Sequence, residues 1–278
     1  MESRGEPAIR LTGLSKAFDG KVVLDRLDLT VAAGESIVVL GTSGTGKSVL
    51  LKHVIGLLQP DAGTVEISGE DFWKAPRMRR DRIRRKFGMS FQEGALFDSM
   101  SVGENIAFPL TRHTSKSPRE IRERVAECLE MVRLPGIEAK RPSELSGGMR
   151  RRVGFARAIA LAPEILLFDE PTTGLDPITT DVIMRVIEEL GSRLNPTTVT
   201  ITHDLKVAFA IADRVALLYG GKIALALPPE EFEKSDDPHA AAFVRGDSTL
   251  EPEDGREVAP PASPPPPPRG SATIGAEP

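Results

Sequence analysis

Cysteine is nearly absent from this chain of 278 residues, and Cys128 is the only one. No disulfide can therefore form within the chain, which fits a reducing compartment. Long apolar runs are absent too. The most apolar late stretch, 215–227, is interrupted by two glycines and a lysine, so we predict no membrane-spanning helix. The first residues are charged, at Glu2, Arg4 and Glu6, and we expect no secretory signal.

A surplus of basic residues is also lacking. The chain has 36 lysines and arginines against 40 aspartates and glutamates, a net charge of −4. Nucleic-acid-binding domains are typically basic, so we expect no nucleic-acid partner. The fractions of hydrophobic residues, 40%, and of charged residues, 27%, are typical of a globular protein with a buried core. We expect a cytoplasmic protein.

Against these absences stands one strong motif, the sequence G-T-S-G-T-G-K-S. It matches G-x-x-x-x-G-K-[ST], follows a short apolar run at 37–40 and precedes a helical pattern at 49–58. Its glycines let several backbone N–H groups face one point, and the helix N-terminus adds positive potential there. A glycine-rich turn that happens to precede a lysine would lack this strand–loop–helix setting. We therefore predict a nucleoside triphosphate site formed by Gly41, Thr42, Ser43, Gly44, Thr45, Gly46, Lys47 and Ser48.

Two later apolar runs end in residues that suit this chemistry. The run at 165–168 leads directly into Asp169 and Glu170, where ligands bind in open α/β sheets. Asp169 can hold Mg²⁺ and Glu170 can accept a proton from an attacking water, although adjacent carboxylates can also form a surface turn. The run at 198–202 ends at His203, which position alone leaves open between a structural role and a sensor of the γ-phosphate.

The N-terminal part reads as antiparallel strands. Residues 8–31 alternate in polarity around an Asp-Gly turn, and 63–69 forms another short strand pattern. Phe18, at the foot of the hairpin, is either a core residue or a platform for an adenine ring. The basic stretch 74–86 favours a solvated helical face over a nucleic-acid contact or attraction to an anionic membrane surface.

Helical patterns dominate from 101 to 160. One helix starts at Ser117, with proline next and Glu120 completing a capping box, and runs to about 133. Another, at 150–161, follows Ser146 and two glycines, a sequence that can both cap a helix and hold an anion. A further helix is predicted from Asp176 to about 193. The order of elements predicts a parallel α/β core with a helical insertion.

The composition changes sharply near the C-terminus, where prolines and acids replace apolar residues and five consecutive prolines stand at 264–268. So little apolar surface cannot offset the entropy of ordering, and we expect disorder there. We therefore predict a nucleotide-binding domain over 1–246, with a helical subdomain at about 93–160, and a disordered Pro-rich tail over 247–278.

Taken together, residues 8 to about 245 resemble the ATP-binding subunits of ABC transporters. Gln92 matches the Q-loop, the sequence L-S-G-G-M at 145–149 matches the signature, and Asp176 belongs to the D-loop sequence G-L-D. His203 matches the switch histidine. Met149 departs from the usual glutamine of the signature. The resemblance implies a P-loop NTPase (RecA-like) core with an N-terminal antiparallel β subdomain and an α-helical insertion.

The resemblance also implies a mechanism in which two copies sandwich two ATP molecules head to tail. Catalysis would rest on Glu170, assisted by His203 and Gln92. Each ATP would lie between the P-loop of one subunit and the signature of the other. The implied contacts are the P-loop 41–49 including Val49, with Phe18 under the adenine; Ser146, Gly147 and Gly148 in trans; and Ser48, Gln92 and Asp169 for Mg²⁺.

Several stretches resemble the Mla/Mce-type phospholipid transport ATPases in particular, namely 91–102, 104–110, 145–160 with Met149 at the end of the signature, 168–178 and 243–246. The implied partners are an integral membrane permease, an Mce-domain lipid-binding protein and a small regulatory subunit. The implied location is peripheral, on the cytoplasmic face of the inner membrane.

Three other classes compete with this interpretation. An ABC importer for a polar solute such as an amino acid would have identical catalytic residues. A soluble ABC ATPase acting on nucleic acid usually carries two cassettes or long insertions, which this chain lacks. A P-loop GTPase is set aside because no Asn-Lys-x-Asp motif is present.

Overall fold

The computed structural model describes residues 6–247, which form two sheets and a group of helices. The smaller sheet is antiparallel in the order β2-β1-β4-β5. The larger follows the order β10-β9-β3-β8-β7-β6, parallel except for its edge strand β10. The strands are β1 (Ile9–Phe18), β2 (Lys21–Val31), β3 (Ser36–Leu40), β4 (Ala62–Ile67), β5 (Glu70–Asp71), β6 (Phe87–Ser90), β7 (Ile165–Asp169), β8 (Thr197–Thr202), β9 (Arg214–Tyr219) and β10 (Lys222–Leu227).

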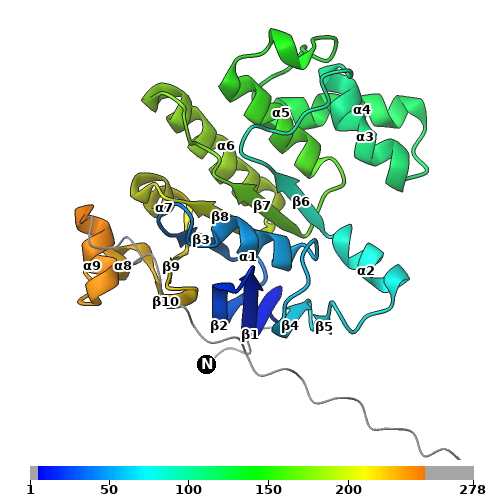
Figure 1. The fold of residues 1–278 in the computed structure, drawn as a ribbon. Helices are drawn as coiled ribbons and strands as arrows, with labels where there is room; N and C mark the ends of the chain where they lie inside the picture. Colours follow the sequence, from blue (N-terminus) through cyan, green and yellow to red (C-terminus); the bar gives the residue numbers. More distant parts are fainter. Residues whose placement is uncertain (1–5, 248–278) are drawn as a thin grey trace, which may run out of the picture.

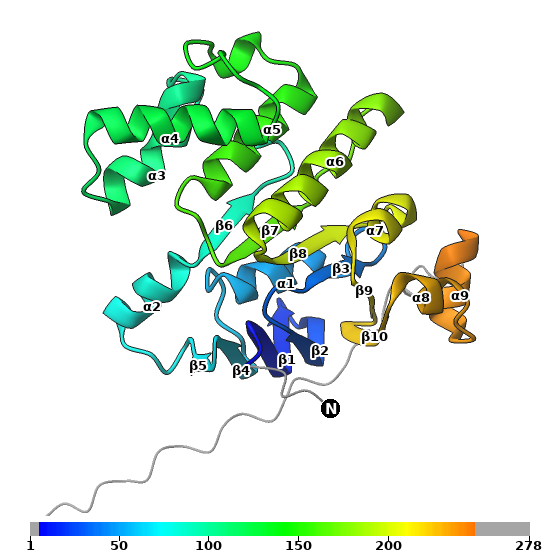
Figure 2. The same ribbon diagram turned by 180° about the vertical axis from the view of Figure 1, so that it is seen from behind.

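The helices divide between the core and an insertion. In both ribbon views the insertion lies beyond one edge of the larger sheet and the smaller sheet lies on the opposite side (Figures 1 and 2). The helices are α1 (Lys47–Val54), α2 (Arg77–Arg84), α3 (Val102–His113), α4 (Pro118–Met131), α5 (Gly147–Ile159), α6 (Pro177–Leu194), α7 (Leu205–Ile211), α8 (Pro229–Glu233) and α9 (Pro238–Arg245), with a 3-10 turn at Pro142–Glu144. The predicted α/β core with an antiparallel β subdomain and a helical insertion is confirmed.

The alternation of side chains along each strand divides the core into two. In β3, Ile37 and Val39 pack with α1 and the smaller sheet, whereas Val38 and Leu40 pack with the helices of the other face. Both clusters are almost fully buried. Cys128 lies in the second cluster, where burial raises the pKa of its thiol to about 11. The thiol is therefore a packing group.

Local sequence signals explain most helix boundaries. Ser117 and Glu120 form the predicted capping box at the start of α4, and Asp176 caps α6 through the backbone N–H groups of residues 178 and 179. The predicted helix at 49–58 was wrong at its end, because α1 stops at Val54. Gly56 has a φ of +70°, and a Cβ there would lie 2.1 Å from the Phe72 ring. The left-handed backbone at Gly56, which packs directly against the Phe72 ring, is incompatible with a continued helix.

The basic stretch 74–86 contains α2, of which only Ile83 is buried. Several of its cations are paired: Arg79 contacts Glu70 and Arg84 contacts Asp81. Figure 2 shows α2 standing away from the helical insertion. Within residues 6–247, no helix is long and apolar enough to cross a membrane. The predicted disorder of the Pro-rich tail concerns residues that, from 248 onward, lie outside the described part of the chain.

Candidate active site

Four loops of chemical interest leave the larger sheet at the same edge. Strands β3, β8, β7 and β6 are parallel neighbours, and their register pairs Leu40 with Thr202, Asp169 with Ile201, and Ser90 with Phe168. The P-loop follows β3, His203 follows β8, Glu170 follows β7 and Gln92 follows β6. The carboxyl ends of adjacent parallel strands thereby gather residues that are far apart in the sequence.

The P-loop is shaped to receive an anion. Gly44 and Gly46 have φ angles of +82° and +100°, which only glycine adopts readily, and Gly46 precedes α1 without any side-chain cap. The N–H groups of the first turn of α1 are therefore open to an anionic ligand. The Thr42 hydroxyl is buried without a hydrogen-bond partner. An unsatisfied donor at this place also favours a polar ligand.

Lys47 holds the positive charge of this loop in a buried position. Its Nζ donates to the carbonyl oxygens of Gly41, at 2.7 Å, and Thr42, at 3.0 Å, and lies 3.6 Å from Glu170 Oε1. Burial lowers the pKa of Lys47, and the charge of Glu170 opposes this effect. A partly desolvated ammonium group gains much from an added phosphate.

Two carboxylates face the P-loop from the end of β7. Asp169 Oδ1 lies 3.5 Å from the Ser48 hydroxyl. Burial, followed by the neighbouring charge of Glu170, raises the pKa of Asp169, so negative charge in this place is incompletely compensated. Hydroxyl and carboxylate oxygens beside incompletely compensated negative charge form a donor set that suits a hard divalent cation.

Glu170 is the most constrained residue of the site. Its φ of +46° is left-handed, and its backbone N–H donates to the Ile201 carbonyl at 2.9 Å. Its Oε2 accepts a hydrogen bond from the Thr173 hydroxyl at 2.8 Å and lies 3.0 Å from His203 Nδ1. Such strain typically persists at functional sites. In the His203 tautomer that donates through Nδ1, Nε2 is the hydrogen-bond acceptor.

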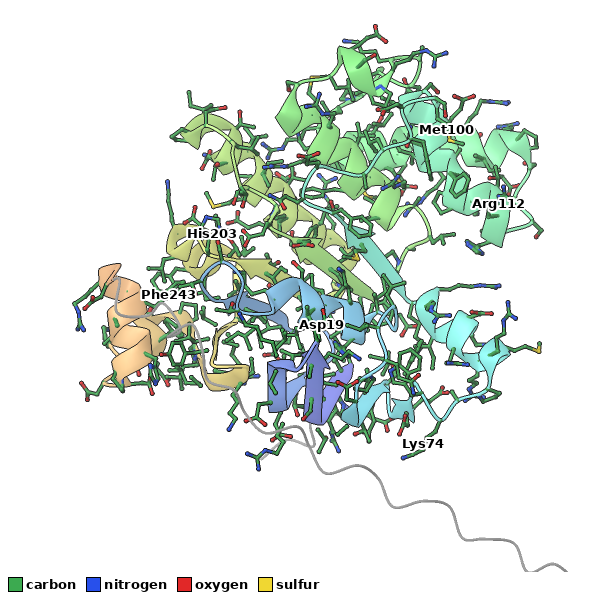
Figure 3. All side chains as sticks on the ribbon, in the orientation of Figure 1. Asp19, Lys74, Met100, Arg112, His203 and Phe243 are labelled. Atoms are coloured by element: carbon green, nitrogen blue, oxygen red, sulfur yellow. The ribbon has the colours of Figure 1, made fainter. Side chains whose placement is uncertain are left out.

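Among residues 6–247, the side chains of Ser146 and Gln92 are not hydrogen-bonded to this cluster. Within the described residues, no hydrogen bond joins the side chains of Ser146 or Gln92 to the P-loop. The Ser146 hydroxyl instead accepts from the Met149 N–H at 3.3 Å, as the N-cap of α5. Figure 3 shows His203 on the core, on the opposite side from Met100 and Arg112 of the insertion. Within one chain, the residues around the P-loop therefore contact one another, whereas the signature serine is hydrogen-bonded to its own helix and not to the P-loop.

Phe18 is 41% exposed, so the interpretation as a core residue is wrong. Its ring lies 5.4 Å from Lys16 Nζ and keeps a surface open to a flat ligand.

Sequence reasoning missed two residues that organise the site. Thr173 holds Glu170, and Arg151 donates to backbone carbonyls on both sides of the site. Thr173 is adjacent to the D-loop, and Arg151 lies within a run of three arginines, which no motif distinguishes. Only the folded contacts identify them.

This sheet edge, with a P-loop before a helix and paired carboxylates two strands away, defines a P-loop nucleoside triphosphatase. The family model described as ABC transporter matches residues 24–173, and the chain belongs to that family. It is an ATP-binding, ATP-hydrolysing cassette.

Relatives and solved structures agree with this assignment. The chain is 42% identical over 239 residues to the probable ribonucleotide transport ATP-binding protein mkl of Mycobacterium tuberculosis, covering 86% of this chain and 67% of mkl. It is 40% identical to the intermembrane phospholipid transport system ATP-binding protein MlaF of Haemophilus influenzae, covering 86% of this chain and 91% of MlaF. A dimeric ATP-binding cassette in a post-hydrolysis state, with ADP and phosphate, matches with a TM-score of 0.73 at 32% identity, over 80% of this chain and 98% of that one.

Proposed function

We propose that this ATPase powers the movement of phospholipids by a separate membrane permease. The observation that carries the proposal is the match to MlaF, which spans 91% of a protein named for intermembrane phospholipid transport. The mkl relative is named for ribonucleotide transport, and the match spans 67% of it. Because the match covers a larger share of MlaF than of mkl, it favours phospholipid as the transported molecule. The partners would be the permease, an Mce-domain lipid-binding protein and a small regulatory subunit at the cytoplasmic face of the membrane.

ATP would bind with its phosphates in the P-loop 41–49, against the open N–H groups of α1 and Lys47. Phe18 would stack on the adenine. Glu170 would accept the proton of the attacking water, because its carboxylate is held by Thr173 and lies beside both Lys47 and His203. His203 and Gln92 would orient that water.

The residues present fit Mg²⁺. Ser48 and Asp169 would hold it together with Gln92, and the donor set of oxygens and the poorly compensated charge of Asp169 support this. When bound, Mg²⁺ supplies positive charge against the β- and γ-phosphates.

The second half of each ATP site would come from another copy of the chain. Ser146, Gly147 and Gly148 begin α5, and the Ser146 hydroxyl uses only an acceptor position in capping it. Its O–H hydrogen therefore remains available to a γ-phosphate, beside the positive end of the helix dipole. Asp176 of the D-loop would lie near the dimer axis. Two chains would close over two ATP molecules and reopen after hydrolysis removes the bridging charge.

The permease would dock beside the Q-loop, against aromatic residues that the fold leaves exposed. Phe91 and Phe97 are 41% and 43% exposed. The Phe97 ring lies 5.1 Å from that of Phe108 and 5.8 Å from the guanidinium carbon of Arg157. Asn105 fixes the loop beneath, accepting from the Phe97 N–H and donating to its carbonyl. A rigid apolar surface of this kind suits an amphipathic helix of a partner.

The proposal is tested by purifying the complex from its native membrane in mild detergent and identifying its proteins and lipids by mass spectrometry. A lipid permease, an Mce-domain protein and phospholipid are expected. Recovery of a permease for ribonucleotides or another polar solute would contradict phospholipid as the transported molecule but would leave the ATPase assignment unchanged. Recovery of no membrane protein would contradict the transport role.

The docking surface has its own test. Phe97→Ser is expected to abolish recovery of the permease while the ATPase activity of the isolated protein stays within about twofold. Met78→Ser is the matched control, since Met78 is an exposed apolar residue of α2. Equal loss of the permease in both variants would contradict this docking surface.

A further inference from the structure

Arg151 is a buried cation whose hydrogen bonds converge on the catalytic edge. It lies in the second turn of α5 and is 8% exposed. Its Nε donates to the Gln92 carbonyl at 2.7 Å, its Nη1 donates to the Pro171 carbonyl at 3.2 Å, and its Nη2 donates to the Thr173 carbonyl. One guanidinium therefore holds the Q-loop and the turn after Glu170 together.

No carboxylate within residues 6–247 forms an ion pair with Arg151. Burial lowers the pKa of its guanidinium, and the charge of Glu93 opposes this effect. A buried cation whose hydrogen-bond partners are all carbonyl oxygens is an energetically costly way to join two segments. The rigid fork of arginine nevertheless fixes three acceptors in one plane, which a lysine cannot do.

The same face of α5 contacts the Q-loop at two further points. Residues 151, 154 and 157 are three apart and share one side of the helix. A Cβ on Gly154 would lie 2.9 Å from the Cα of Gly94, so the backbones are in close contact. Arg157 donates to the carbonyls of Gly94 and Ala95 at 2.8 and 2.9 Å. A shift of α5 must therefore displace the Q-loop with it.

A short chain of contacts leads from Arg151 to the catalytic carboxylate. Arg151 donates to the backbone of Thr173, and the Thr173 hydroxyl donates to Glu170 Oε2. The N-terminus of α5 carries Ser146, five residues before Arg151. The helix that would contact ATP in one site thus also holds Glu170, which would serve the other site.

We propose that Arg151 is a positioning residue that couples the signature end of α5 to Glu170 and Gln92 of its own chain. Contact of Ser146 with ATP across the dimer would set α5, and Arg151 would set the position of Glu170 accordingly. The inference rests on the proposed roles of Glu170 and the signature. It extends them by naming the side chain that joins the two sites.

The first test is the steady-state ATPase kinetics of Arg151→Met. We expect kcat to fall by about 10- to 100-fold, because small misplacements of a catalytic group cost this much, with KM for ATP within about threefold. Arg124→Met is the matched control. Arg124 also donates to two backbone carbonyls, those of Ile159 and Ala160 at the other end of α5. We expect its kcat to stay within about threefold.

The second test is a double-mutant cycle with Thr173→Val. If Arg151 acts through Thr173, the double variant loses no more than about the larger single loss in kcat. Multiplication of the two single losses would overturn the proposal, as would an increase in KM at unchanged kcat. Should Arg151→Met not fold, Arg151→Gln and Arg151→Lys retain fewer donors and are expected to give intermediate kcat values. Full kcat in both of these would also overturn it.

Failure of this inference is distinguishable from failure of the proposed mechanism. An inactive Glu170→Gln together with a fully active Arg151→Met would remove only the positioning role. A fully active Glu170→Gln would remove the catalytic assignment on which that role depends.

Discussion

The P-loop edge of the larger sheet and the signature at the start of α5 differ in how many contacts each makes within one chain. At the edge of the larger sheet, Glu170 lies within hydrogen-bond or ion-pair distance of three side chains, those of Lys47, Thr173 and His203. At the N-terminus of α5, the Ser146 hydroxyl forms its one hydrogen bond within residues 6–247 to its own helix, accepting from the Met149 N–H. The sheet edge retains strain and poorly compensated charge, whereas the helix end is locally satisfied.

This difference indicates that the two regions can be altered independently by mutation. Three features raise the free energy of the ligand-free site: the left-handed backbone of Glu170, the desolvated ammonium group of Lys47 and the poorly compensated carboxylate of Asp169. A bound ligand of suitable charge can offset the last two. The signature end of α5 is instead satisfied by its own helix cap, and under the proposed function a second chain would present it to ATP. Variants can therefore separate binding, chemistry and assembly.

The largest effect is expected for Glu170→Gln. Removal of the proton acceptor should lower kcat by about 10² to 10⁴-fold, the usual contribution of a general base. ATP binding should persist, because the amide keeps the shape of the side chain, and the ATP-bound dimer should accumulate. Turnover assays and size-exclusion chromatography with ATP would show this. Wild-type turnover in this variant would exclude Glu170 as the base.

Lys47→Ala should weaken ATP binding itself. Charged hydrogen bonds contribute about 1.5–3 kcal/mol, so the dissociation constant should rise by about 10- to 100-fold. Titration with a fluorescent ATP analogue measures this. Lys52→Ala, at the last turn of α1, is the control and should bind within about threefold. Unchanged affinity in Lys47→Ala would contradict the P-loop assignment.

Ser146→Asn tests the other end of the comparison. Asparagine caps helices as well as serine does, so the melting temperature should change by less than about 2 °C. ATP binding by the monomer should remain, whereas ATP-driven dimerisation and turnover should fall by about tenfold. Light scattering in the Glu170→Gln background measures dimerisation. Dimerisation equal to that of Glu170→Gln alone would show that the signature does not contact ATP in trans.

The smallest effect is a gain of stability in Asp169→Asn. The raised pKa means that the folded chain retains this proton at pH values where the unfolded chain has lost it. The contribution of Asp169 to the free energy of unfolding therefore falls as pH rises above its ordinary pKa of 3.8 and through the raised folded value. At neutral pH the ionised group destabilises the ligand-free fold.

Asp169→Asn should accordingly raise the melting temperature at pH 7 by about 2–4 °C while turnover is lost, and the gain should shrink near pH 4. Calorimetry at both pH values measures it. Asp98→Asn, at an exposed position in the loop after β6, is the control and should change neither quantity. A lower melting temperature for Asp169→Asn at pH 7 would show that its charge is well compensated.

The sequence predicted the architecture because its signals are local. Capping by Ser117 and Asp176, the Asp-Gly turn and the apolar runs at 37–40 and 165–168 each act over a few residues, and the structure confirms the elements that they predict. The end of α1 was missed because it depends on Gly56 passing under Phe72, sixteen residues away.

The same division applies to the site. Residue types and order alone determined the P-loop, the paired carboxylates and the family, since phosphate binding demands glycines and a lysine at fixed spacing. Only the tertiary structure decided that Phe18 is exposed, that Thr173 holds Glu170, and that Arg151 joins the Q-loop to the turn beyond β7. These facts depend on contacts between segments up to 59 residues apart, whose geometry is set by the register of parallel strands and the packing of α5.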